Sequence, residues 1–135
     1  MLTDTGPLVA ILDRRDPQHE ASLAVLGGLP RGPLLTSWPC FTEAMYLLGA
    51  VGGQRYQGSL WRLRRDGRLT LLDLTPTEVD RMDALMAQYA NVPMDLADAS
   101  LVALAESRRD PRLFTLDSDF RIYRLAGGSA LEIAP

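Results

Sequence analysis

The chain has 135 residues, 47% of them hydrophobic, and its 17 acids and 14 bases give a net charge of −3. This length suits one domain over residues 1–135 that buries roughly two thirds of its unfolded surface, and the hydrophobic share excludes disordered and fibrous classes. All 14 bases are arginine, so mechanisms that need a lysine, such as a Schiff base or a phosphate-binding loop, are excluded.

The chain alternates short strand patterns with helical periods along its whole length. In order, we expect a strand at 1–4, helices at 8–12 and 17–26, a strand at 34–36, helices at 38–51 and 54–66, a strand at 69–72, helices at 76–89 and 95–106, and strands at 113–116 and 131–133. Strands that alternate with helices predict a parallel sheet covered on both faces. The predicted fold class is therefore α/β, a three-layer α/β/α sandwich with a central parallel sheet of about four to five strands.

Cysteine and histidine occur once each, as Cys40 and His19, which excludes an internal disulfide and a typical zinc site. An enzyme of this composition would depend on carboxylates, hydroxyls or a hard metal ion. The most apolar stretch, 34–53, is interrupted by Pro39 and Glu43, and the strand pattern at residue 1 leaves no room for a signal peptide. We expect no membrane segment and a cytoplasmic location.

Several acids stand where the fold alone would favour apolar residues, at the ends of strands or in apolar helices. They are Asp4, Glu43, Asp95, Asp98, Asp117 and Asp119. In a parallel sheet, residues that follow the first and fourth strands emerge at the carboxyl edge, where functional groups gather. Two carboxylates about 4 Å apart repel by about 4 kcal/mol at an effective dielectric near 20, so such a cluster calls for protons or a cation.

An acidic site made only of oxygen ligands favours Mg²⁺ or Mn²⁺, which activate water and neutralise the charge of a phosphodiester. Each acid also has an ordinary structural interpretation. Asp4 and Asp95 could cap helices, Glu43 could pair with an arginine in the core, and one of Asp117 and Asp119 could form a turn. The other acids, including Asp16 and Glu106, are interpreted as surface residues.

Four motifs occur in order along the chain: Asp4-Thr5-Gly6-Pro7, Thr42-Glu43-Ala44, Met94-Asp95-Leu96-Ala97-Asp98-Ala99 and Phe114-Thr115-Leu116-Asp117-Ser118-Asp119-Phe120. Together they resemble the motifs of PIN domains, and most closely those of VapC-like toxins of type II toxin–antitoxin systems. The resemblance implies an endoribonuclease that uses Mg²⁺ or Mn²⁺. It implies that Asp4, Glu43 and Asp98 are the core acids, with the metal held directly or through water.

The fourth motif gives Asp117 as the fourth acid and Thr115 as its accompanying hydroxyl, with Asp119 and Asp95 as additional candidates. The resemblance further implies an RNA substrate, a small cognate antitoxin and a homodimer. Two alternatives remain: a PIN nuclease of RNA maturation or turnover without an antitoxin, and a catalytically silent PIN-like module that binds RNA or protein.

A basic stretch supplies candidate RNA-binding residues, namely Arg62, Arg64, Arg65 and Arg68, close to Tyr56 and Trp61. The alternative is a solvated helix face with both aromatic rings turned into the core. Apolar residues of the preceding helix, such as Trp38, Met45, Tyr46 and Leu48, are interpreted as core rather than as a dimer face.

Overall fold

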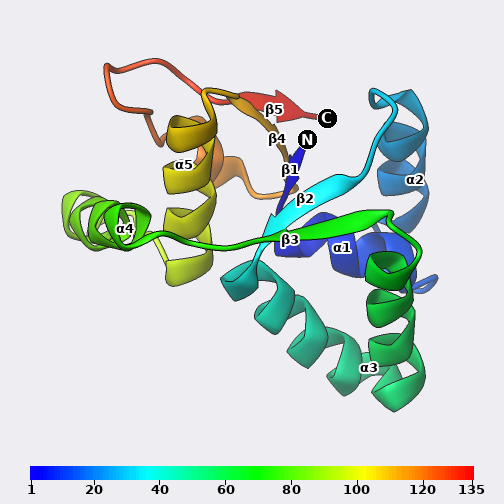
Figure 1. The fold of residues 1–135 in the computed structure, drawn as a ribbon. Helices are drawn as coiled ribbons and strands as arrows, with labels where there is room; N and C mark the ends of the chain where they lie inside the picture. Colours follow the sequence, from blue (N-terminus) through cyan, green and yellow to red (C-terminus); the bar gives the residue numbers. More distant parts are fainter.

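The central sheet of the computed structural model, which describes residues 1–135, has five parallel strands in the order β3-β2-β1-β4-β5 (Figure 1). The strands are β1 (Leu2–Thr3), β2 (Leu34–Ser37), β3 (Leu69–Leu72), β4 (Arg112–Phe114) and β5 (Glu132–Ala134). Leu2 lies opposite Leu35 on one side and Leu113 on the other. The parallel sheet predicted from the alternating elements is confirmed.

Helices cover both faces of this sheet, with α4 and α5 on one side and α1, α2 and α3 on the other (Figure 1). The helices are α1 (Thr5–Leu12), α2 (His19–Gly28), α3 (Trp38–Arg65), α4 (Pro76–Gln88), α5 (Leu96–Arg108) and the short 3₁₀ helix η1 (Ser118–Arg121). Within α3, Gly53 has φ 62° and ψ −154°, which separates the two helical segments expected at 38–51 and 54–66. None of the helices is long and apolar enough to cross a membrane.

Alternating side chains along the strands separate two apolar cores. In β2, Leu34 packs with α1 and α3, whereas its neighbour Leu35 packs with α5 on the opposite face. This alternation is the expected consequence of a pleated strand buried on both sides. The sheet therefore fixes where each helix lies relative to the carboxyl ends of the strands.

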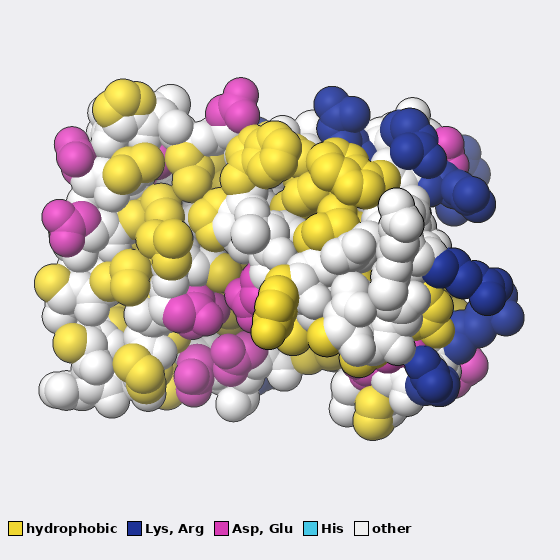
Figure 2. All heavy atoms as spheres, turned by 90° about the horizontal axis from the view of Figure 1, so that it is seen from below, with side chains coloured by type: hydrophobic (Ala, Val, Ile, Leu, Met, Phe, Trp, Pro, Cys, Tyr) yellow, Lys and Arg dark blue, Asp and Glu magenta, His cyan; other side chains and the backbone are white.

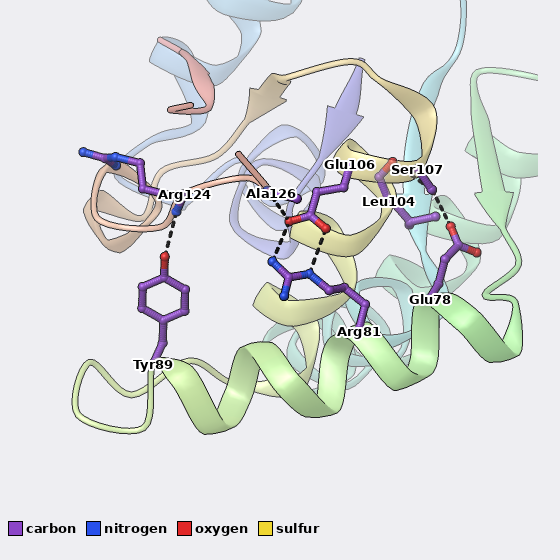
Figure 3. A network of polar contacts seen from close by, with 8 residues as sticks. All are labelled: Glu78, Arg81, Tyr89, Leu104, Glu106, Ser107, Arg124 and Ala126. Atoms are coloured by element: carbon purple, nitrogen blue, oxygen red, sulfur yellow. Dashed lines mark hydrogen bonds and ion pairs between the residues drawn. The ribbon is translucent and has the colours of Figure 1, made fainter. Parts of the chain in front are cut away.

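A polar network attaches α4 to α5 and to the chain beyond β4 (Figure 3). Arg81 donates two hydrogen bonds to the carboxylate of Glu106, at 2.9 and 3.0 Å, and the backbone N–H of Ala126 donates to the same carboxylate at 2.9 Å. The backbone N–H of Arg124 donates to the Tyr89 hydroxyl at 2.9 Å. The interpretation of Glu106 as an ordinary surface acid is therefore wrong, because it joins three segments of the chain.

Candidate active site

A cleft of about 400 Å³ lies at the carboxyl edge of the sheet and is lined by acids from several elements. The acids that line it are Asp4, Asp16, Glu43, Asp95, Asp98 and Asp117. Asp4 directly follows β1 and Asp117 lies three residues beyond β4, the neighbouring strand. The side chains of Ser37 and Ser100 hydrogen bond at 2.6 Å, which holds the start of α3 against α5. Five of the six acids that the sequence pattern singled out, all but Asp119, thus line one cleft.

Asp4 is the N-cap of α1 and is only 7% exposed. Its Oδ1 accepts the backbone N–H of Thr5 at 2.7 Å, and its Oδ2 accepts the Thr115 hydroxyl at 2.7 Å. Burial raises the pKa of Asp4, and the charges of Asp117 and Asp95 raise it further, while the two hydrogen bonds oppose the shift. Asp4 therefore caps a helix, as one interpretation held, and still contributes its carboxylate to the cleft wall.

Asp98 lies in the first turn of α5 and is also 7% exposed. The hydroxyl of Tyr123, a fully buried residue, donates to its Oδ2 at 3.1 Å. Burial and then the charge of Asp95 raise the pKa of Asp98 to about 7. Sequence reasoning missed Tyr123, because it lies between Arg121 and Arg124 in a stretch of mixed polarity that does not indicate burial. Once the ring is buried, its hydroxyl must find a partner.

Glu43 projects into the cleft from α3 and is exposed. Partial burial raises its pKa, and the charges of Asp95 and Asp4 add to the shift. The two ion pairs of the structure, Arg81–Glu106 and Arg112–Asp110, both lie elsewhere. The interpretation that Glu43 pairs with an arginine in the core is therefore wrong, and no ion pair compensates the negative charge of the cleft.

The fourth motif places Asp117 in the cleft and leaves Asp119 outside its lining. The chain turns into η1 directly after Asp117, whose Oδ1 accepts the backbone N–H of Asp119 at 2.9 Å. Because the backbone does not stay extended, the two carboxylates do not share a side. Asp95 caps α5 by accepting the backbone N–H of Asp98 at 2.8 Å, and it remains exposed at the cleft.

Asp16 is an addition to the candidates, since it lines the cleft from the turn before α2. Its carboxylate accepts the backbone N–H of Gln18 at 2.8 Å. The interpretation of Asp16 as an ordinary surface acid is therefore incomplete, because a polar turn gives no indication of the tertiary contact that brings it here.

The cleft suits a hard divalent cation by its donors and charge, since its titratable lining consists only of carboxylates and it contains no arginine. Three of these carboxyls have raised pKa values, for which burial is the largest cause in each case and neighbouring acids add to the shift. A bound cation would relieve both effects. No group of three or more His, Cys, Asp or Glu side chains forms a ready-made metal site, so the cleft offers charge and oxygen donors rather than a preformed cage.

The basic stretch lies away from the cleft. The side chains of Arg62, Arg64, Arg65 and Arg68 are all exposed, outside the cleft lining and free of ion pairs. Figure 2 shows acidic side chains at the left and centre of one face and arginines at its right end, with apolar surface between them. Tyr56 is partly buried against the core of α1 and α3. Trp61 is 39% exposed, but its ring meets the buried Phe41 edge-on at a centroid distance of 5.0 Å, so one side of it also packs against the core.

The apolar residues of the first α3 segment divide between the core and the surface. Leu48 is fully buried, but Trp38 is 44% exposed and Tyr46 is 75% exposed. The core interpretation is therefore wrong for Trp38 and Tyr46.

The molecule is thus an α/β/α protein in which acids from α3, from α5 and from the chain directly after β1 and β4 line one cleft. The family model for the PIN domain matches residues 1–126, and the chain belongs to this family. It is 26% identical over 136 residues to Ribonuclease VapC26 of Mycobacterium tuberculosis, with both chains fully covered.

Solved structures share the same fold. The crystal structure of VapC20 from Mycobacterium tuberculosis, a toxin that cleaves the sarcin–ricin loop, has a TM-score of 0.82 at 17% identity, with 95% of each chain covered. A toxin–antitoxin complex from Klebsiella pneumoniae has a TM-score of 0.66 at 22% identity, with 88% of each chain covered. VapBC2 from Rickettsia felis, bound to a promoter DNA fragment, has a TM-score of 0.68 at 14% identity and covers 99% of this chain and 98% of its own.

Proposed function

We propose that the chain is a VapC-type endoribonuclease that hydrolyses RNA phosphodiester bonds with Mg²⁺ or Mn²⁺. The observation that supports this function is the single cleft that collects Asp4, Glu43, Asp98 and Asp117 without any basic side chain. A catalytically silent binding module would have no reason to maintain this unfavourable concentration of charge. The relative VapC26 is named a ribonuclease, which supports the same substrate class.

The four acids divide into two roles. Asp4, Asp98 and Asp117 would hold the ion, which would supply charge neutralisation on the phosphodiester and lower the pKa of a nearby water. Glu43 is exposed in the cleft and has a raised pKa, so it would orient that water and accept its proton for in-line attack. The Thr115 hydroxyl fixes one oxygen of Asp4 and thereby directs the carboxylate.

Tyr123 should affect metal binding through Asp98, although it lies outside the cleft lining. Tyr123→Phe removes one hydrogen bond to a buried carboxylate, and we expect it to lower the free energy of unfolding by about 1–2 kcal/mol and Mn²⁺ affinity about tenfold. Calorimetric titration of the purified protein with Mn²⁺ measures the second effect. Tyr46→Phe, at a residue 75% exposed, is the matched control; equal Mn²⁺ affinities in the two variants would contradict this role.

A small antitoxin is the proposed protein partner, and a homodimer the proposed assembly. Two of the structural neighbours were solved as toxin–antitoxin complexes, which supports the first proposal. A PIN nuclease of RNA maturation would share the cleft but have no such partner.

Expression in a bacterial host, alone and together with the neighbouring small reading frame, tests the toxin proposal. We expect growth arrest that the second gene relieves. In parallel, the purified protein should cleave RNA in Mg²⁺ or Mn²⁺ and stop when EDTA removes the ion. Cleavage that persists in EDTA would contradict the metal role, and normal growth with active enzyme would favour the maturation nuclease.

A further inference from the structure

A second hollow of about 710 Å³ runs along β3, the edge strand of the sheet. Its lining includes Trp38, Arg64, Arg65 and Asp73, together with residues of β3 itself. We propose that this β3 groove binds a single-stranded segment of the RNA whose scissile phosphodiester enters the acidic cleft. The inference rests on the proposed ribonuclease function and adds the surface that holds the substrate.

The strand register places one end of the β3 groove at the same edge of the sheet as the cleft. Leu2 pairs with Leu35, so Asp4 is level with Ser37 and Trp38 follows one residue later. Ser37 pairs with Leu72, which puts Asp73 level with Trp38 at the same carboxyl edge. A strand rises about 3.3 Å per residue, so the four residues of β3 span about 13 Å. The groove follows them from this edge toward Arg64 and Arg65.

Trp38 offers a fixed surface for stacking an unpaired base. Its indole Nε1 donates to the Asp73 carboxylate at 3.2 Å, and its ring meets Phe41 edge-on with a centroid distance of 5.8 Å. The indole still remains 44% exposed and lines the groove. Contacts on two sides hold the ring in one orientation, so little side-chain entropy is lost when a base stacks on it.

Arg64 and Arg65 supply charge for phosphates. Both side chains are exposed and neither makes an ion pair, so their guanidinium groups are available to an anion. Arg62 and Arg68 lie close to them in the sequence, so positive charge is concentrated here although the whole chain carries a net charge of −3. This concentration of positive charge beside an aromatic platform matches a single-stranded nucleic acid.

Binding measurements with a short fluorescein-labelled oligouridylate test the proposal, using full-length protein with Asp98→Asn so that the RNA stays intact. We expect Trp38→Leu to weaken binding about tenfold without changing its salt dependence, because stacking is not ionic. Arg64→Gln with Arg65→Gln should weaken binding and reduce the slope of log K against log salt by about 1.4, about 0.7 for each lost phosphate contact. The control is Arg108→Gln with Arg109→Gln, an adjacent arginine pair at the end of α5, which should change neither the affinity nor the slope.

Unchanged affinity in both groove variants would overturn the proposal and leave the open edge of β3 to a peptide strand. An equal slope change in the Arg108 and Arg109 control would also overturn it, since the effect would then be general electrostatics. RNA cleavage by the wild-type chain distinguishes a failure of the groove proposal from a failure of the proposed ribonuclease function. If the wild-type chain cleaves RNA, and the groove substitutions change neither binding in the Asp98→Asn protein nor cleavage when made in the wild-type chain, the groove proposal fails and the proposed function stands. Absence of both cleavage and binding defeats both.

Discussion

Asp98→Asn should reduce the rate of RNA cleavage about a thousandfold or more, while RNA binding persists. The substitution keeps an oxygen that can accept the Tyr123 hydroxyl and the backbone N–H of Asp95, so the local fold should be retained. It removes one negative charge from the donors proposed to hold the ion. Losing about 4 kcal/mol of transition-state stabilisation corresponds to three orders of magnitude in rate. Single-turnover cleavage of a labelled RNA in Mn²⁺ measures the effect.

The fourth motif contains a matched control for this experiment. Asp117→Asn should also impair cleavage, because Asp117 lines the cleft, whereas Asp119→Asn two residues later should leave the rate within a few-fold of wild type. Both changes remove one charge from the same loop, and asparagine at 117 keeps an oxygen that can accept the backbone N–H of Asp119, so net charge and loop structure should be similar in the two variants. Equal losses at the two positions would contradict the assignment of Asp117 as the acid that acts in the cleft.

The sequence was sufficient for the features that depend on local pattern and strand order. A charge at the end of an apolar strand, as at Asp4, or alone in an apolar helix, as at Glu43, has few structural reasons to be there. Once the sheet is parallel, the positions after the first and fourth strands must emerge at the same edge. The fold class and the meeting of the four motif acids could therefore be predicted from the sequence alone.

The remaining features depend on tertiary contacts that leave no periodic signal. Tyr123 reaches Asp98 only because the chain after η1 packs beneath α5, and Asp16 reaches the cleft through an irregular turn. Trp38 is a large apolar residue of the kind that usually lies in a core. It is, however, the first residue of α3 at the edge of the sheet, and its ring is exposed to solvent on one side. Whether such a residue is buried depends on where its helix or strand begins and ends, and sequence patterns locate these boundaries least accurately.

The stability of the metal-free protein should decrease as the pH rises from about 4 to about 7. Burial and the charge of Asp95 raise the pKa of Asp98 to about 7 in the fold, whereas an unfolded aspartate titrates near 4. The folded state therefore binds this proton more tightly than the unfolded state. Its contribution to stability is fully present below about pH 4 and is lost as the pH rises through about 7. Burial shifts the pKa values of Asp4 and Glu43 in the same direction.

Comparison with Asp98→Asn isolates this effect from other titrations, such as that of Asp110, whose pKa Arg112 lowers to about 2. As the pH rises from 4 to 8, the free energy of unfolding of the variant should increase by about 1–2 kcal/mol relative to that of the wild type. This is less than the full pKa shift would give, because water reaches the cleft and screens its charges. For a chain of this size each kcal/mol corresponds to about 3–5 °C in Tm. Thermal unfolding of both proteins in EDTA across this pH range measures the difference.

Adding Mn²⁺ should reverse the trend in the wild type. At pH 7 an ion present at a hundred times its Kd stabilises the fold by about 2.7 kcal/mol, and it binds the ionised carboxylates whose repulsion weakens the metal-free protein. The Asp98→Asn variant should gain much less from Mn²⁺, although it is the more stable protein without the ion. If the wild type neither loses stability toward pH 7 nor regains it when Mn²⁺ is added, the proposed binding of a cation by the cleft acids is contradicted. We expect Asp98→Asn to be the more stable protein in EDTA and the wild type to be the more stable one in Mn²⁺. This reversal would show that the acids that destabilise the metal-free fold are the ones that bind the ion.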